Sequence, residues 1–383
     1  MELGVGGSSP PSCTKKMIKE KKTKLLKETP LGFVDRTEKE LLIRDTIISN
    51  IKEVMVKFGF QYLETPSFEY SDSIGKFLPD KERPDEGVFS FKDENKWLSL
   101  RYDLTAPLAR YVAKNYLEIP KPFKRYQLGT VWRNEKPGPG RFREFLQFDA
   151  DYVGTKSLQA DAELCVMISE ILEECGLAKS EYIIKISSRK ITEELFKKIN
   201  INNNQQKITI LRALDKIDRL GWNGVKELLG EGRKDKSGDF TKGANLKLED
   251  IKTIEETLKK NSPETEDLVE ILKIFKDYSF DNFELDPSVI RGLEYYTGAI
   301  FEVNLKFDVT NNKGQVIQFG SIGGGGRYDN LINNFGNYDA PATGISIGLD
   351  RLVYALMQKK EFKVKQSKPV VICVFDKNSM KDY

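Results

Sequence analysis

Residues 291–298, with the sequence RGLEYYTG, place a guanidinium, a carboxylate and two adjacent phenols between glycines. The run that follows, residues 299–304, is rich in apolar and β-branched residues and predicts a strand. Arg291, Tyr295 and Tyr296 are therefore expected at the mouth of a strand, where they could hold a small polar ligand. Taken alone, Arg291 and Gly292 are equally compatible with a surface turn.

A second polar surface is predicted between residues 123 and 154, where two strand-like runs flank the proline- and glycine-rich loop Asn134–Gly140. Counting by twos along the second run gives one apolar face with Glu144 in it, made by Phe142, Leu146, Phe148, Ala150 and Tyr152. The other face carries Arg141, Arg143, Phe145, Gln147, Asp149 and Asp151, and Arg133 ends the first run. Arginines suit phosphate oxygens and carboxylates suit an ammonium group. A solvent-facing sheet with internal salt bridges is the alternative.

Three further segments could contribute to a ligand site. In Leu100–Pro107, Asp103 and Thr105 precede a predicted helix, and either could simply cap it. Gly323–Gly326 follows a predicted strand over 315–321 and would let the backbone approach a ligand; it has no GxGxxG register, and a flexible linker is the alternative. Arg351 falls in the first turn of a helix predicted over 349–359, where a cation opposes the helix dipole, so an anionic ligand is expected there.

Composition limits the chemistry. The 383 residues include 61 Lys and Arg against 58 Asp and Glu, so any nucleic-acid contact must use a local patch. The chain contains no histidine, which excludes Ser/His hydrolases and histidine-based metal sites. The four cysteines show no CxxC spacing, and no long apolar run or signal-peptide core occurs, so a cytoplasmic protein is predicted. Activation of a carboxylate by ATP needs no imidazole and stays possible.

The elements that position these residues are also predictable. Thr37 and Glu40 form a capping box before an amphipathic helix that ends at Gly59, and a strand over 60–66 ends at a proline, as an edge strand can. A helix is predicted over 158–175 with Cys165 and Cys175 in the core, and a strand over 183–186. Residues 190–278 are charged and rich in helical patterns, with a break over 230–243. We therefore predict an α+β fold with a mixed, mainly antiparallel sheet, flanking helices and a helical insertion.

These segments together resemble the histidyl-tRNA synthetases, a class II aminoacyl-tRNA synthetase family, over about residues 29–359. RGLEYYTG resembles the signature that holds histidine, the segment around 37–66 resembles motif 1, the 123–154 pair resembles motif 2, and 344–352 resembles motif 3. The resemblance implies a ligase that uses ATP and Mg²⁺ to make histidyl-adenylate and then charges tRNA(His). It also implies a homodimer through residues 37–69.

By the same resemblance each candidate residue has an expected role. Arg133 and Arg291 would be catalytic, acting at the α-phosphate. ATP would be bound by Arg133, Glu135, Arg141, Arg143 and Arg351. Histidine would be bound by Asp103, Thr105, Gln147, Asp151, Arg291, Tyr295 and Tyr296. Asn134 and Leu146 stand where many family members carry histidine, which puts recognition of the tRNA end in question.

The expected organisation has five parts. Residues 1–28 form a disordered basic tail, 29–189 the first part of the catalytic domain, 190–280 the helical insertion, and 281–365 the second part. Residues 366–383 are expected to begin an anticodon-binding domain that the chain does not complete. An RNA-contacting role for the tail is the alternative to an incidental extension. The rival functions are the histidine-sensing regulatory subunit of ATP phosphoribosyltransferase, which lacks that domain, and a class II synthetase for another amino acid.

Overall fold

An eight-stranded sheet lies at the centre of the computed structural model, which describes residues 26–75, 87–235, 238–260, 265–290, 295–311, 313–317, 319–359 and 373. In spatial order its strands are β1 Gln61–Tyr62, β5 Phe123–Trp132, β6 Glu144–Val153, β15 Ala342–Gly348, β14 Gly323–Arg327, β11 Ala299–Leu305, β7 Tyr182–Ser188 and β10 Phe283–Leu285. All pairs from β5 to β7 are antiparallel, and the short edge strands β1 and β10 pair in parallel. The predicted α+β fold is confirmed.

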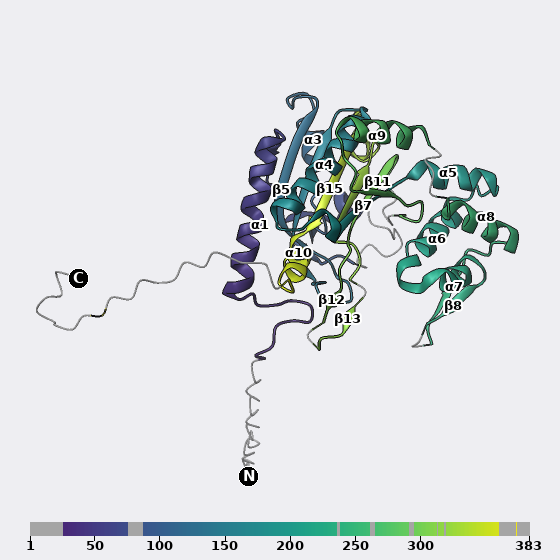
Figure 1. Cartoon of the computed structure of the whole chain (residues 1–383), viewed down its shortest axis with the longest axis horizontal. Helices are drawn as coiled ribbons and strands as arrows, with labels where there is room; N and C mark the ends of the chain where they lie inside the picture. Colours follow the sequence, from purple (N-terminus) through teal and green to yellow (C-terminus); the bar gives the residue numbers. More distant parts are fainter. Residues whose placement is uncertain are drawn as a thin grey trace, which may run out of the picture.

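One face of the sheet is the main apolar core. Phe148, Ala150 and Tyr152 of β6 lie in this core, as the alternation along the strand predicts. The helices that cover this face are α1 Glu38–Lys57, α4 Leu158–Glu174, α9 Glu266–Asp277 and α10 Leu349–Leu356 (Figure 1). Cys165 and Cys175 are buried among them, as expected.

Helix α1 begins where its sequence predicts. The Thr37 amide donates to the Glu40 carboxylate at 2.9 Å, which completes a capping box, and Gly59 follows the helix with a φ of 73°. The chain then enters β1, which lies at the edge of the sheet as predicted but is shorter than the strand expected over 60–66.

The opposite face of the sheet is covered only in part. Helix α3 Thr105–Lys114 and the 3-10 turn η2 Ile332–Phe335 pack together over one end of this face and enclose a second apolar cluster. A three-stranded sheet, β2 Phe68–Tyr70, β4 Lys96–Leu100 and β3 Ser90–Asp93, lies beside α2 Ser71–Gly75. The remaining part of the face carries polar side chains.

The helical module has its own core. It contains α5 Arg189–Lys198, α6 Asn204–Leu214, α7 Ile217–Leu229, α8 Leu248–Leu258 and the hairpin β8 Gly232–Lys234 with β9 Phe240–Lys242. Its buried apolar residues, from Leu195 to Leu258, form a cluster apart from the main core. Figure 1 shows α5, α6, α7 and α8 grouped to one side of the sheet. Helix α9 packs on α4 with Leu268, Ile271 and Phe275 in the main core, so the expected insertion of 190–280 is too long at its end.

The flexible-linker alternative for Gly323–Gly326 is wrong: these residues open β14, paired on both sides by β11 and β15. An added Cβ on Gly325 would overlap the Gly344 carbonyl oxygen, so the close pairing requires glycine. The strand expected over 315–321 is only β13 Val316–Ile317, which pairs with β12 Val309–Thr310 outside the main sheet.

Some expectations fall on residues outside the described ranges. These are Arg291, residues 1–25 of the tail, and 366–383 apart from Cys373. Within the described part of the chain, no helix has the length and apolar character needed to cross a membrane.

Candidate active site

The polar face of the sheet contains a cavity of about 530 Å³. A smaller one of about 160 Å³ adjoins it, and the two are lined in common by Arg133, Glu135, Gln147, Gly324 and Ser346. We call the larger cavity the carboxylate end and the smaller one the arginine end, after the side chains that line them. The shared residues make the two cavities parts of one site.

The floor of the carboxylate end is set by strand register. On β6, Gln147, Asp149 and Asp151 point to the polar face and line the cavity. Their partners on β15 are Gly348, Ser346 and Gly344. An added Cβ on Gly344 would overlap Oδ1 of Asp151, so the absent side chain makes room for that carboxylate. The predicted polar face of β6 is therefore confirmed from Gln147 to Asp151.

The two aspartates of the floor lie buried side by side. Asp149 accepts hydrogen bonds from Gln147 Nε2 at 2.7 Å and Thr105 Oγ1 at 3.3 Å. Asp151 accepts one from the Tyr328 hydroxyl. Burial, followed by the charge of Asp151, raises the pKa of Asp149 to about 7. Burial also raises the pKa of Asp151. A cationic ligand would favour the ionised form of both.

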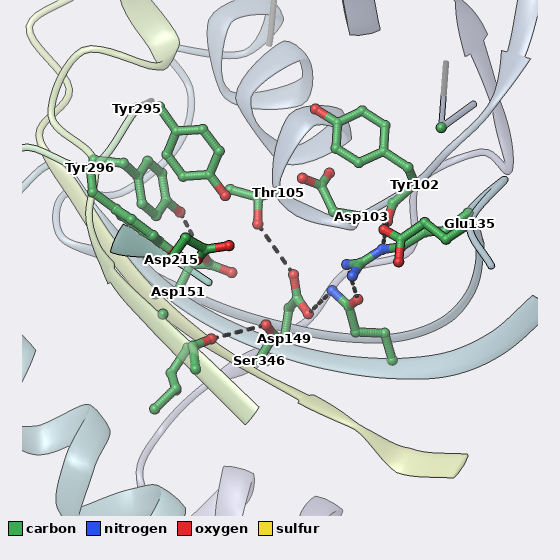
Figure 2. Close-up of a pocket in the computed structure, with 18 of the residues that line it drawn as sticks. Tyr102, Asp103, Thr105, Glu135, Asp149, Asp151, Asp215, Tyr295, Tyr296 and Ser346 are labelled. Carbon is green, nitrogen blue, oxygen red and sulfur yellow. Dashed lines mark hydrogen bonds between the residues drawn. The ribbon is translucent and has the colours of Figure 1, made fainter. Parts of the chain in front are cut away.

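Asp103 and Thr105 bring α3 into the site. Asp103 Oδ1 accepts from the Ala106 amide at 3.0 Å, so this residue does cap the helix, and its side chain also lines the cavity. Burial raises the pKa of the Asp103 carboxyl. Figure 2 shows Asp103 and Thr105 above Asp149, with Tyr295 to one side and Glu135 to the other. The capping and ligand-site expectations for this segment are compatible.

Tyr295 and Tyr296 line the carboxylate end from the loop before β11. Their ring centroids lie 4.9 Å apart with an edge-on geometry. Tyr295 also packs edge-on against Tyr328, and burial raises the pKa of the Tyr295 phenol well above its usual range. Both phenols are thus positioned beside the carboxylates, and Tyr295 stays a neutral hydroxyl at physiological pH.

Arg133 joins the two ends. Its Nε donates to the Tyr102 carbonyl at 3.0 Å, and its guanidinium lies 5.2 Å from the centroid of the Phe145 ring. Its Nη2 donates to Gln147 Oε1 at 3.3 Å. Gln147 in turn donates to Asp149, so a hydrogen-bond chain runs from the arginine end to the floor (Figure 2).

Two charged side chains of the arginine end are partly exposed. Arg141 pairs with Glu135 at 2.7 Å, with side chains 57% and 40% exposed, so both stay accessible to a ligand. Arg351, in the first turn of α10, lies with its guanidinium 4.7 Å from the centroid of the Phe319 ring. Both arginines line the smaller cavity, as expected for sites of anion binding.

Arg143 is placed differently from its prediction. Strand β6 begins at Glu144, so the alternation by twos does not extend back to Arg141 and Arg143. Arg143 Nε donates to the Glu135 carbonyl at 3.0 Å, and the residue lines neither cavity. It supports the loop that carries Glu135. Phe142, expected on the core face, lines the arginine end for the same reason.

Comparison with known proteins identifies the family. The sequence profile described as histidyl-tRNA synthetase matches residues 32–352 of the chain. The chain belongs to the histidyl-tRNA synthetase family. It is 48% identical to the histidine–tRNA ligases of Bartonella quintana (strain Toulouse) and Rhizobium meliloti (strain 1021), over 94% of this chain and 77% of each relative.

Solved structures agree with this assignment. The histidyl-tRNA synthetase of Nostoc sp. PCC 7120 is 26% identical and superposes with a TM-score of 0.67, over 88% of this chain and 76% of that one. A Bacillus halodurans protein described as an ATP phosphoribosyltransferase regulatory subunit/histidyl-tRNA synthetase gives a TM-score of 0.66 at 24% identity, over 87% and 84%. The second likeness shows the shared fold alone.

The sequence analysis of this histidyl-tRNA synthetase family member did not predict three residues that lie at or next to the site. Arg125 is fully buried below the floor, Tyr328 donates to Asp151, and Asp215 reaches the cavity from the helical module. The alternation of β5 contains the signal for Arg125, because Arg125 is the cross-strand partner of Asp151. No local pattern identifies Asp215, since its approach depends on how the module packs.

Proposed function

We propose that this chain activates histidine with ATP to form histidyl-adenylate and transfers the histidyl group to the 3′ end of tRNA(His). The observation that carries the proposal is Arg133, which lines both the carboxylate end and the arginine end. A residue in that position can contact the α-phosphate of ATP and stay within reach of an amino acid bound on the floor. Membership of the histidyl-tRNA synthetase family supports the same reaction.

The carboxylate end suits histidine. Asp103 and Thr105 would take the ammonium group, and Gln147 and Asp151 would contact the rest of the amino acid. Tyr295 and Tyr296 supply hydroxyls and ring faces for an imidazole. The carboxylates are buried, which strengthens their interaction with a cation relative to the same pair in water. Arg291, outside the described residues, keeps its predicted role at the α-phosphate.

The arginine end suits ATP. Arg133 would neutralise the α-phosphate, Glu135 would lie on the adenine side, Arg141 would take the outer phosphates, and Arg351 the γ-phosphate. Arg143 would act through the Glu135 loop, because its guanidinium is hydrogen-bonded to that backbone. The open geometry of Arg141 and Glu135 allows both to turn toward a nucleotide.

The chemistry needs mainly positioning. An oxygen of the histidine carboxylate, already ionised at neutral pH, forms a bond to the α-phosphorus while the bond to the bridging oxygen breaks and pyrophosphate leaves. Charge builds on the α-phosphate oxygens, where a fixed guanidinium lowers the barrier. The tRNA hydroxyl then attacks the histidyl carbonyl carbon and AMP leaves.

Mg²⁺ is proposed as the ion that accompanies ATP. In the described residues no cluster of three or more His, Cys, Asp or Glu could hold a metal by itself. This fits Mg²⁺, which is usually bound by one or two carboxylates together with substrate phosphates. Most of the ion's ligands would then be phosphate oxygens and water, and the ion would neutralise phosphate charge at the arginine end.

Exchange of labelled pyrophosphate into ATP tests the reaction. The purified protein should show exchange when histidine is supplied and none with the other amino acids. A folded protein that binds histidine without supporting exchange would contradict the proposal and favour the histidine-sensing regulatory role. Exchange driven by a different amino acid would instead show a synthetase of other specificity.

A homodimer through residues 37–69 is also proposed. Exposed aromatic side chains gather near this region: Tyr62, Phe68, Tyr70, Phe91 and Trp97. An apolar surface of this kind marks an interaction site, and β1 presents an open sheet edge beside it. Phe68→Ser should raise the dimer dissociation constant at least tenfold in analytical ultracentrifugation, whereas Leu117→Ser, an exposed apolar control elsewhere, should not. A monomeric wild-type protein would contradict the proposal.

A cytoplasmic location stays a prediction of the sequence.

A further inference from the structure

The floor of the carboxylate end continues beneath the cavity as a ladder of polar residues. Across the β5–β6 pair, Gln127 lies opposite Asp149, and Arg125 lies opposite Asp151. Residues directly opposite in an antiparallel pair share a face and lie close enough to interact. Asp149 and Asp151 line the cavity, while Arg125 does not. The ladder therefore places a cation beside the carboxylates that face the ligand, on the same face of the sheet.

Arg125 is held without any access to solvent. Its exposed fraction is 0%, and its Nη2 lies 3.0 Å from Asp151 Oδ2. The same Nη2 donates to the Leu104 carbonyl at 2.9 Å, in the segment that carries Asp103 and Thr105. One buried guanidinium thus contacts two of the three sequence segments proposed to bind the amino acid.

The buried ion pair of Arg125 with Asp151 is not expected to stabilise the fold. Burying an arginine and a carboxylate costs several kcal/mol per ion before their attraction is counted. Within the described residues, Arg125 Nε and Nη1 have no hydrogen-bond partner, so the desolvation is incompletely offset. Apolar side chains of similar volume would fill the same space at lower cost. A role in the site accounts for the charge better than a role in folding.

The reason for the charge lies in the acids above it. Asp103, Asp149 and Asp151 are all nearly inaccessible and close enough to affect one another's pKa. Burial pushes each pKa upward, and the Arg125 charge acts in the opposite direction at all three. Acids that hold protons would bind an ammonium group poorly. Arg125 counters this effect before any ligand arrives.

We infer that Arg125 is a positioning residue for the amino acid, orienting the Asp151 carboxylate and supplying the countercharge that lets Asp149 and Asp151 face a cationic ligand as carboxylates. It acts through these acids and does not touch the substrate. The inference rests on the proposed function, because it takes histidine to be the ligand on this floor.

Other ionisable groups face the same acids and bear on any pH effect. The acidic ones are Asp103, Glu135 and Asp215, and the cationic ones are Arg101 and Arg133. Among the described residues, the phenols of Tyr102, Tyr295, Tyr296 and Tyr328 also line this end. None of these groups is altered by a substitution at Arg125, so the comparison below isolates one charge.

The test compares Arg125→Met, which keeps much of the volume, with Arg125→Lys, which keeps the charge. Binding of histidinol is measured by calorimetry from pH 5.5 to 9. Histidinol retains the ammonium and imidazole of histidine but has no carboxylate, so its binding is independent of adenylation. Its own titration is common to all variants and cancels. Circular dichroism checks that each variant is folded.

Arg125→Met should weaken histidinol binding at least tenfold at pH 7. The acidic limb of the profile, which is the pH range in which affinity falls as the acids take up protons, should move to higher pH by roughly 1 unit or more. Arg125→Lys should keep the limb near its wild-type position. Adding Asp151→Asn to Arg125→Met should weaken binding no further than Asp151→Asn alone, since the arginine acts through that acid.

Three results would overturn the inference: a limb that does not move in Arg125→Met, a lysine variant that matches the methionine variant, or wild-type protein that binds no histidinol. If Arg125→Met does not fold, the lysine variant decides alone: an unmoved limb with histidinol binding near that of the wild type supports the inference, and binding weakened tenfold or more contradicts it. If the protein shows no pyrophosphate exchange but the limb moves in Arg125→Met, the proposed function is contradicted and the inference about Arg125 is still supported.

Discussion

The two ends of the site differ in how their charges are held. At the carboxylate end, Asp149 and Asp151 lie on one paired strand, almost inaccessible, with partners fixed by the register of β5 and β15. At the arginine end, Arg141 and Glu135 come from an irregular loop, are about half exposed, and pair mainly with each other. The floor is organised before a ligand binds, whereas Arg141 at the arginine end is exposed enough to change its partner when a ligand binds.

Because of this difference, we expect the carboxylate end to determine ligand specificity and the arginine end to tolerate changes in its partners. A buried, hydrogen-bonded carboxylate rejects ligands that leave it unpaired, because the unpaired charge has no access to water. An exposed arginine pairs with phosphate or solvent at little cost in either state. We therefore expect substitutions on the floor to act on amino-acid binding and on stability, and substitutions in the loop to act weakly on ATP binding.

The largest effect is expected at Arg133, where the two ends meet. Arg133→Ala removes the guanidinium proposed for the α-phosphate and breaks the chain through Gln147 to Asp149. The rate of histidine-dependent exchange should fall by roughly 10²–10³. Arg133→Lys, the matched control, keeps the charge but loses the forked contact and should recover only part of the rate. A kcat within tenfold of wild type for Arg133→Ala would show that the ends are not joined through this residue.

Much of this site could be predicted from the sequence because its residues follow regular elements. Alternation places Gln147, Asp149 and Asp151 together on β6, and the helix start places Arg351 beside the smaller cavity. The same rule fails at Arg143, where the chain is still in the loop and turns the side chain onto a carbonyl. Gly323–Gly326 misleads because flexible composition occurs here in a paired strand, where neighbours leave no room for side chains.

Other features depend on tertiary packing that no short pattern records. Asp215 reaches the cavity only because the module lies beside the sheet, and α9 joins the main core through contacts with α4. Arg125 is a different case. The alternation of residues along β5 predicts which face of the sheet it lies on, but not that it is buried. A charged residue on a strand is usually predicted to be exposed. Here the segment that begins α3 contacts Arg125, and the side chain is buried.

The second expected effect is at Asp149 and has two opposite consequences. Its pKa is raised from 3.8 to about 7, so its contribution to stability is present below pH 4 and is lost as pH rises toward 7. Asp149→Asn should therefore stabilise the ligand-free protein by roughly 1–3 kcal/mol at pH 8 and by little at pH 4. The same change should raise the KM for histidine about tenfold or more, because a carboxylate that faces the cationic ligand is lost.

Thermal unfolding at pH 4 and pH 8, with exchange kinetics, measures both consequences. Asp281→Asn is the matched control, an exposed acid for which neither quantity should change appreciably with pH. Equal stabilisation at both pH values would contradict the assignment of a costly buried charge to Asp149. An unchanged KM would separate that charge from amino-acid binding.

The smallest effect is expected at Arg141. Its pair with Glu135 is largely exposed, so Arg141→Ala should change stability by less than about 1 kcal/mol. Loss of one accessible phosphate contact should raise the KM for ATP about three- to tenfold and leave the KM for histidine unchanged. The increase should shrink in 0.5 M salt, because exposed charges are screened within a few ångströms. Lys156→Ala, which removes a more exposed cation lining neither cavity, should leave the KM for ATP unchanged. If Arg141→Ala instead lowers kcat by two orders of magnitude with the KM for ATP unaltered, the loop is as firmly organised in the transition state as the floor is, and the contrast between the two ends fails.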